Sequence, residues 1–224
     1  MEKINKFKSI SSIKIVGVIT SVVFLLSVIY NVVNIIIGYG SIYAIILPTI
    51  FFIMGIYMFI KPYKKGFAIY LSIYILYFII NIGLIVMIAG YEYASQIVFE
   101  AIWLVYFTYI YVKIKDIKVD ESDVKIYNDS IKAFEKNDLF YMSVTNLLYT
   151  SRWVCTLYEN YILVKHKFPF SKMLIDKRTF KFDFGNANSN ILLGYVHYNN
   201  KKRMCRMKKQ EYEAYKQLMN IKYK

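Results

Sequence analysis

Four residues carry the side chains that most often bind transition metals or act as nucleophiles: Cys155, His166, His197 and Cys205. Structural zinc sites use Cys or His pairs separated by about two to five residues, and none of the four residues belongs to such a pair. We therefore expect cysteines that are small core residues, histidines that are polar groups at a sheet edge, and no metal or other cofactor. The sequence also lacks a glycine-rich phosphate loop, a nucleophile elbow and paired carboxylates, so we expect a protein that is not an enzyme.

One acidic residue, Glu100, stands inside a long apolar stretch. A carboxylate within a membrane-spanning helix usually faces the interior of the helix bundle or water, and it often marks a functional site. Asn31 and Asn34 are expected at about the same depth in another apolar stretch, where they could donate hydrogen bonds to Glu100. The three residues form a candidate intramembrane polar cluster. The alternatives are that Glu100 reaches the outer interface, that its helix starts lower, or that the polar residues serve only helix packing.

The segment KKRMCRMKK carries six basic residues and no acid in nine positions. Beside a membrane, each such charge is worth about 1 kcal/mol against anionic headgroups. The candidate residues for binding headgroups or a partner are Lys201, Lys202, Arg203, Arg206, Lys208 and Lys209. Alternative ligands are an acidic protein or nucleotide phosphates, and the alternative without a ligand is a solvated strand edge protected by lysine. Nucleic acid is not expected as the main partner, because the aromatic residues alternate along the predicted strands as core residues do and do not form a platform on which bases could stack.

These residues are positioned by a chain whose two halves differ sharply. Overall, 57% of the residues are hydrophobic and the mean hydropathy is +0.36, more apolar than an ordinary soluble domain. Residues 1–112 carry only seven lysines and three glutamates, although the whole chain has a net charge of +14. Lys outnumbers Arg 25 to 4, a bias typical of AT-rich codons that predicts a low-GC bacterial source.

Four stretches are long enough to cross a membrane, which takes about 20 mostly apolar residues. They are residues 15–37, 41–60, 67–89 and 93–112. The first is longer than the apolar region of a signal peptide and lacks a small-residue cleavage pattern, so we expect an uncleaved span. The short connectors predict neighbouring helices that pack as antiparallel hairpins.

The basic residues that flank these stretches predict their orientation. They occur before the first span, in KPYKKG between the second and third, and after the fourth, whereas the connectors GYGS and GYEY have none. Basic residues near span ends stay on the cytoplasmic side. We therefore expect a multi-pass protein of the bacterial inner (cell) membrane, with both termini in the cytoplasm and the lipid bilayer as its first partner. Cys155 and Cys205 would then be reduced.

The polar half begins with a predicted linker helix over residues 115–137, with Asp120 and Ser122 as candidate caps and a strand from Val124 as the alternative. The pattern then changes to a period of two. RWVCTLYENYILVKHK predicts a hairpin with Tyr158 opposite Tyr161, and RTFKFDF places its three phenylalanines on one side of a strand. The segment LFYMSVTNLLY fits a strand or a helix. The last segment, KKQEYEAYKQLMNIK, predicts an amphipathic helix whose apolar face holds Ala214, Tyr215, Leu218, Met219 and Ile221.

This order of elements, with KFPFSKMLIDKRTF midway, resembles the pleckstrin-homology-like domains attached to small bacterial membrane proteins. The resemblance covers about residues 138–222 and implies a small curved sheet capped by the C-terminal helix, used for binding or assembly rather than catalysis. We thus predict three parts: a four-helix transmembrane domain (1–114), the linker helix (115–137) and a cytosolic antiparallel β-rich domain with a C-terminal helix (138–224).

The predicted function is binding of lipid headgroups, a partner protein or a small ligand by the basic cytosolic domain, as in a sensor, scaffold or effector. An alternative places the function in the spans, as a small channel, a transport component or a toxin immunity protein with Glu100 in the working site. A membrane enzyme acting on lipid is the third hypothesis, although the ionisable residues expected at the inner interface are almost all lysine.

Overall fold

The computed structural model describes residues 1–84, 94–136, 138–145, 149–166, 171–185 and 190–220. The chain divides into two compact units. The helical unit is residues Ser12–Val119, and the sheet unit combines Met1–Ser11 with Asp120–Lys224. The predicted linker segment therefore falls mostly in the sheet unit, together with the first residues of the chain.

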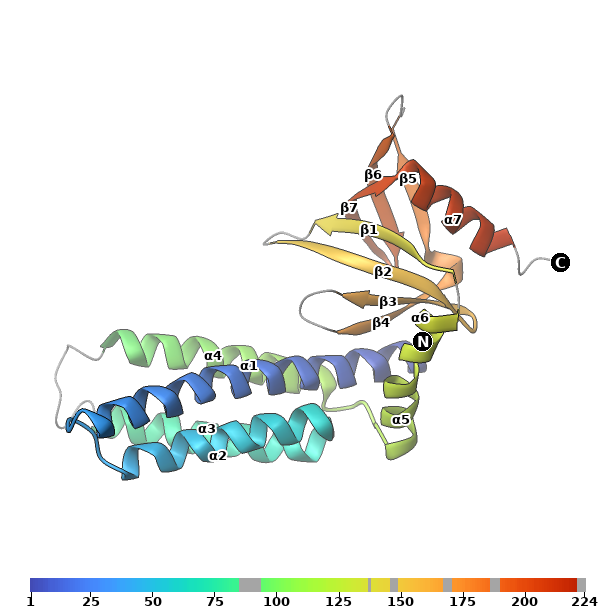
Figure 1. Ribbon diagram of the computed structural model, residues 1–224. Coiled ribbons are helices and arrows are strands. Elements are labelled where there is room, and N and C mark those ends of the chain that lie inside the picture. The colour runs from blue at the N-terminus through green and yellow to red at the C-terminus, as the bar shows by residue number, and fades with distance from the viewer. Residues whose placement is uncertain (85–93, 137, 146–148, 167–170, 186–189, 221–224) are drawn as a thin grey trace. The chain divides into compact units, whose positions relative to one another are not determined.

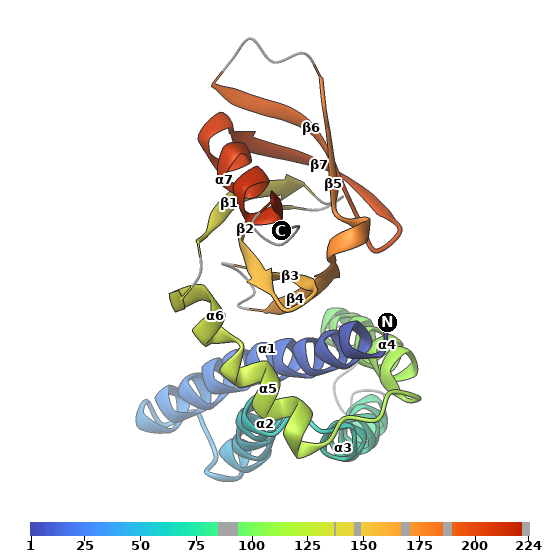
Figure 2. The same ribbon diagram turned by 90° about the vertical axis from the view of Figure 1, so that its right-hand side faces the viewer.

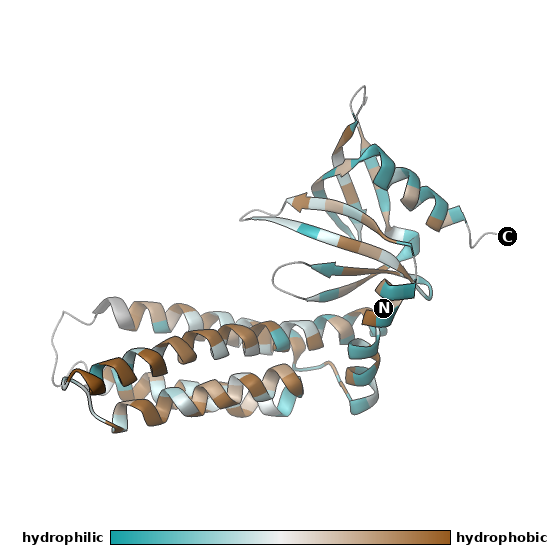
Figure 3. Cartoon of the chain, in the orientation of Figure 1, coloured by the Kyte–Doolittle hydropathy of each residue, from teal (hydrophilic) through white to brown (hydrophobic). Residues whose placement is uncertain are grey.

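Four long helices dominate the helical unit (Figure 1): α1 (Glu2–Ile36), α2 (Tyr43–Ile60), α3 (Lys64–Leu84) and α4 (Ala94–Ile114). All four are long and apolar enough to cross a membrane, and Figure 3 shows that hydrophobic residues predominate along them. Each predicted span is confirmed as a helix, but residues 85–89 and the connector GYEY lie outside the described residues. α1 begins well before the predicted span, and only its residues from Ser12 onward belong to the helical unit.

Aromatic rings form the core of the helical unit. Phe51 of α2 is fully buried, and its ring lies 4.7 Å from that of Phe24 on α1 and 5.9 Å from that of Tyr70 on α3, centroid to centroid. Phe107 of α4 meets Tyr70 and Tyr74 edge to face. Such ring pairs contribute about 0.5–1.5 kcal/mol each beyond the area they bury. Such ring contacts hold α1, α2, α3 and α4 together within the helical unit.

Two short helices, α5 (Glu121–Asp129) and α6 (Ile131–Lys136), form the start of the second part of the sheet unit. The linker is thus helical only from Glu121 and in two pieces rather than the one predicted, and the alternative strand from Val124 is wrong. Asp120 caps α5: its side chain accepts the N–H of Asp123, whose side chain in turn accepts the N–H of Asp120. The hydrogen bond from Ser122 holds the pKa of Asp120 below its ordinary value.

In the described residues, an antiparallel sheet of seven strands follows. The strands are β1 (Phe140–Thr145), β2 (Thr150–Tyr158), β3 (Tyr161–His166), β4 (Lys172–Asp176), β5 (Lys181–Phe184), β6 (Ile191–Tyr198) and β7 (Lys201–Lys208). Their order in the sheet is β4-β3-β2-β1-β7-β6-β5. Sequence neighbours pair within β1–β4 and within β5–β7, and the pairing of β1 with β7 joins the two sets. A 3-10 turn, η3 (Lys177–Thr179), lies between β4 and β5, and helix α7 (Lys209–Asn220) follows β7.

The predicted hairpin is confirmed: Tyr158 pairs with Tyr161, and the chain turns at Glu159, whose φ of 52° lies in the left-handed region. The open choice for LFYMSVTNLLY is decided in favour of strand β1, although residues 146–148 lie outside the described part. Pairing on both sides of β1 places this strand at the centre of the sheet. Because β1 touches both sets of strands, it positions side chains from distant parts of the sequence next to one another.

Helix α7 packs against one face of the sheet, which is its core face (Figure 2). Cys155 of β2 and Cys205 of β7 both point to this face and are almost fully buried. From α7, Leu218 is buried in the core. The other described residues of α7 that pack against the core are Tyr212, Ala214, Tyr215 and Met219. The predicted apolar helix face is therefore confirmed, except for Ile221, which lies outside the described residues.

The first turns of α1 also belong to the sheet unit. Phe7 is 2% exposed, and its ring lies 5.1 Å from that of Tyr127 on α5. Lys3 forms an ion pair with Glu159 at 2.7 Å, and Lys6 forms one with Asp123 at 2.9 Å. Two lysines that the sequence presents only as topology signals therefore also hold the start of the chain within the sheet unit.

Candidate functional site

The four potential metal ligands are distributed over the sheet rather than gathered in one place. Cys155 and His166 share the core face, and His197 and Cys205 lie on adjacent strands but point to opposite faces. Burial raises the pKa of Cys155 and raises that of Cys205 to about 12, so both thiols are unreactive near neutral pH. In the part of the chain that the structure describes, no group of three His, Cys, Asp or Glu side chains could hold a metal ion.

His166 is a structural side chain of the core edge. Its Nδ1 lies 3.1 Å from the hydroxyl of Ser151, and its ring meets the edge of Trp153 at a centroid distance of 5.3 Å. Burial lowers the pKa of His166 to about 4. The imidazole is therefore neutral at pH 7 and does not add to the positive charge of the sheet.

The face of the sheet opposite α7 carries a row of polar and basic residues. Ser143 of β1 pairs with Arg152 of β2 on one side and with Arg206 of β7 on the other. Arg206 pairs in turn with Leu193 of β6. Directly opposed residues in a sheet point to the same face with Cβ atoms about 5 Å apart. Three neighbouring strands, β2, β1 and β7, therefore place one guanidinium group on each side of one hydroxyl.

Apolar side chains share this face with the basic ones. Leu193 and Tyr195 of β6 are 62% and 41% exposed, and Met204 of β7 is 55% exposed. Met204 pairs with Tyr195, and Lys202 lies 4.3 Å above the Tyr195 ring. We call the combined surface the basic face. Its members are Ser143, Arg152, Leu193, Tyr195, Lys202, Met204, Arg206 and Lys208.

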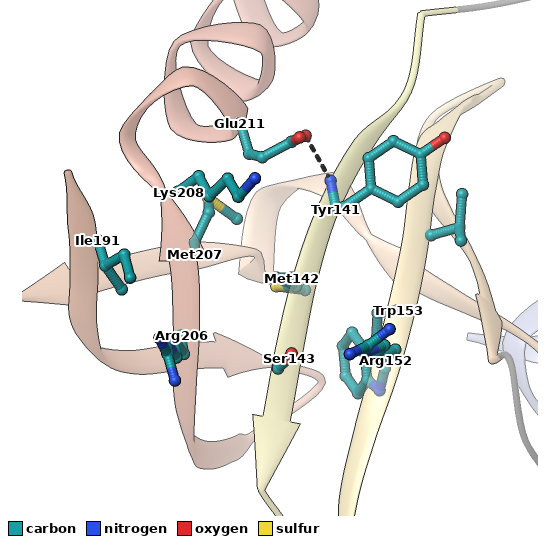
Figure 4. A pocket seen from close by; sticks show the side chains of 11 residues that line it. Tyr141, Met142, Ser143, Arg152, Trp153, Ile191, Arg206, Met207, Lys208 and Glu211 are labelled. Atoms are coloured by element: carbon teal, nitrogen blue, oxygen red, sulfur yellow. Dashed lines mark hydrogen bonds between the residues drawn. The ribbon is translucent and has the colours of Figure 1, made fainter.

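Part of the basic face forms a pocket of about 560 Å³, shown in Figure 4. Arg152, Ser143 and Arg206 line it from three adjacent strands, and Lys208 lies above them in the view. Glu211, from the first turn of α7, borders the pocket and accepts the backbone N–H of Tyr141 at 2.8 Å. The basic side chains that line the pocket outnumber this one acid, so the pocket suits an anion.

The structure splits the six predicted basic residues. Lys202, Arg206 and Lys208 point to the basic face, because the residues between them, among them Cys205 and Met207, are buried in the core. Lys201 and Arg203 lie on the other side of β7, and Lys209 starts α7. Arg152 was missed by the sequence analysis. It is distant in sequence from the basic cluster, although its position between buried Ser151 and Trp153 in an alternating strand was a usable signal.

In the helical unit, Glu100 of α4 is 7% exposed. Its carboxylate accepts hydrogen bonds from Tyr77 and Asn81 of α3, each at 3.2 Å. The described donors thus come from α3, whereas the sequence analysis expected them from α1. Asn31 donates to the carbonyl of Ser27 in its own helix at 2.8 Å, and Asn34 is half-buried on the same helix.

Comparison of the chain with protein-family models, with curated proteins and with solved structures gives no match.

Proposed function

We propose that the protein is a multi-pass membrane protein whose cytosolic sheet unit binds phosphate-bearing anions at the basic face, with the headgroups of anionic lipids as their source. The observation that carries the proposal is the Arg152–Ser143–Arg206 row, which places two guanidinium groups beside one hydroxyl. Arginine suits phosphate because its planar fork donates two parallel hydrogen bonds. The role is binding rather than catalysis.

The apolar members of the basic face favour a lipid surface over a dissolved anion. Leu193 and Met204 are more than half exposed, although each stands beside a basic residue. At a bilayer, apolar side chains enter the boundary between headgroups and acyl chains while basic residues remain with the phosphates. A free phosphate would use only the polar half of this surface. The proposal also draws on the resemblance to pleckstrin-homology-like domains that the order of elements in the sequence suggested.

The membrane placement in this proposal is testable with cysteine labelling, because both native cysteines are buried. We expect a membrane-impermeant maleimide to label Tyr39→Cys on intact cells and to label Lys65→Cys only after the membrane is opened, since lysine-bearing turns stay cytoplasmic. Both positions are exposed. The wild-type chain serves as the unlabelled control. Labelling of Lys65→Cys on intact cells would invert the topology and remove the basic face from the cytoplasm.

The binding prediction concerns the two arginines. With the full chain in phosphatidylcholine nanodiscs, we expect the protein to bind phosphatidylglycerol vesicles but not phosphatidylcholine vesicles. The double variant Arg152→Gln/Arg206→Gln should bind phosphatidylglycerol vesicles roughly thirtyfold more weakly. This corresponds to a loss of about 2 kcal/mol of binding free energy, because each basic residue near the surface is worth about 1 kcal/mol. Vesicle flotation measures the effect.

A charge-matched control separates the basic face from net charge. Lys125→Gln/Lys216→Gln removes the same charge from α5 and α7, outside the pocket, and should leave vesicle binding nearly unchanged. Equal losses in both double variants would mean that only the net charge matters. Glycerol phosphate in solution distinguishes the source of the anion: if it binds the pocket as well as vesicles do, the site serves a dissolved phosphate.

A further inference from the structure

The helical unit contains a second site that the basic face does not involve. A cavity of about 200 Å³ lies among α1, α3 and α4. Seven of its twelve lining residues are aromatic, and the carboxylate of Glu100 lies in its wall. For scale, an apolar cavity of about 150 Å³ accepts benzene. The space therefore has room for a small organic molecule.

The polar groups of this cavity define what it would bind. Glu100 accepts hydrogen bonds from Tyr77 and Asn81, which keep the carboxylate oriented and supply neutral donors to it. Thr20 and Ser27 add hydroxyl groups from α1. Buried next to neutral donors, an ionised carboxylate attracts a cation more strongly than it would in water, because the surroundings screen the charge less. The polarity of the cavity thus points to a positively charged ligand.

The aromatic walls point the same way. Tyr74 and Trp103 both lie against Phe107, at centroid distances of 5.4 and 5.6 Å, with the first pair edge to face and the second stacked. All three rings line the cavity. The negative face of an aromatic ring attracts an ammonium group, and cages of such rings recognise quaternary ammonium ions in particular. A carboxylate among several rings combines charge recognition with an apolar wall.

We propose that this cavity binds a small alkylated ammonium ion, with Glu100 as the counter-ion and Tyr74, Trp103 and Phe107 as the walls of an aromatic cage. The ligand class is an organic cation about the size of choline. A metal ion would contact only the carboxylate, whereas a neutral apolar molecule would contact mainly the rings. The alkylated ammonium ion is the class that uses both.

The test compares two probes that differ in charge alone: choline and its uncharged isostere 3,3-dimethylbutan-1-ol. Equilibrium dialysis with the full chain in nanodiscs should show choline bound more tightly than the isostere. Glu100→Gln keeps the shape of the side chain and removes its charge, so we expect it to weaken choline binding by about tenfold or more and to leave the isostere unchanged. Trp103→Leu should weaken choline binding as well, because it removes a ring from the cage.

Asp116→Asn is the matched control, since Asp116 is an acid of the same unit that does not line the cavity. It should bind choline like the wild type. Size-exclusion elution and melting temperature establish whether each variant is folded. If Glu100→Gln does not fold, Glu100→Asp tests the site in its place. Equal choline binding by wild type and Glu100→Gln would overturn the proposal. So would equal binding of choline and the isostere, which would make the cavity a purely apolar one.

Discussion

Replacing Gly194 with valine is expected to lower the free energy of unfolding of the sheet unit by roughly 3 kcal/mol. A Cβ at Gly194 would lie 2.2 Å from the carbonyl oxygen of Asp183 and 2.8 Å from the Cα of Phe184. Both atoms belong to the backbone of β5, which pairs with β6 at this point. Because backbone atoms cannot rotate out of the way as a side chain can, the strand itself has to move.

The displacement would also affect α7. β5 is the last strand in the order of the sheet and pairs with β6. Its Phe182 and Phe184 rings pack edge to face on Tyr212 of α7, at centroid distances of 5.9 and 5.2 Å. We therefore expect faster hydrogen–deuterium exchange in both β5 and α7 of the variant, together with the lower stability in denaturant titration.

Gly185 provides the matched control, one residue beyond the end of β5. A Cβ there would meet no atom of the described residues within 4 Å, so Gly185→Val should change the stability by no more than about 0.5 kcal/mol. If the two valine variants unfold at the same denaturant concentration, the close approach of β5 and β6 does not limit the stability of the sheet unit.

The elements of this fold follow from local patterns in the sequence. Long apolar stretches predict the four helices, because the thickness of a bilayer sets the length of a span. Alternation predicts the β2–β3 hairpin and the pairing of Tyr158 with Tyr161, because side chains of a strand alternate between two faces. The cap of α5 at Asp120 follows from the acidic residues at its start.

The sites depend on contacts between distant residues, and local patterns carry little of that information. Arg152 and Arg206 meet across β1 because the sheet pairs its first strand with its last, and no short-range pattern specifies this pairing. The described donors to Glu100 come from α3 because helix rotation decides which side chains face each other, and the nearly uniform hydrophobicity of these helices leaves their rotation undefined. Phe7 was missed because the N-terminal lysines were considered only as charges.

A comparable effect to that at Gly194 is expected where α1 meets α2. A Cβ at Gly55 would lie 2.5 Å from the Oγ of Ser21 and 2.9 Å from the carbonyl oxygen of Gly17. A Cβ at Gly17 would lie 2.7 Å from the carbonyl oxygen of Gly55. The two helix backbones are thus in direct contact, and Gly17 with Ser21 forms the small-xxx-small pattern by which helices associate in lipid.

Gly55→Val should therefore force α1 and α2 apart and lower the stability of the helical unit by about 3 kcal/mol, a fall of roughly 10 °C in melting temperature. The same movement would separate the stacked rings of Phe24 and Phe51 and displace the α1 wall of the cavity near Glu100. Thermal unfolding in detergent measures the change. Gly83→Val is the control, because a Cβ at this position of α3 meets nothing within 4 Å in the part of the chain that the structure describes. Identical melting of the two variants would show that the glycine contact does not hold α1 against α2.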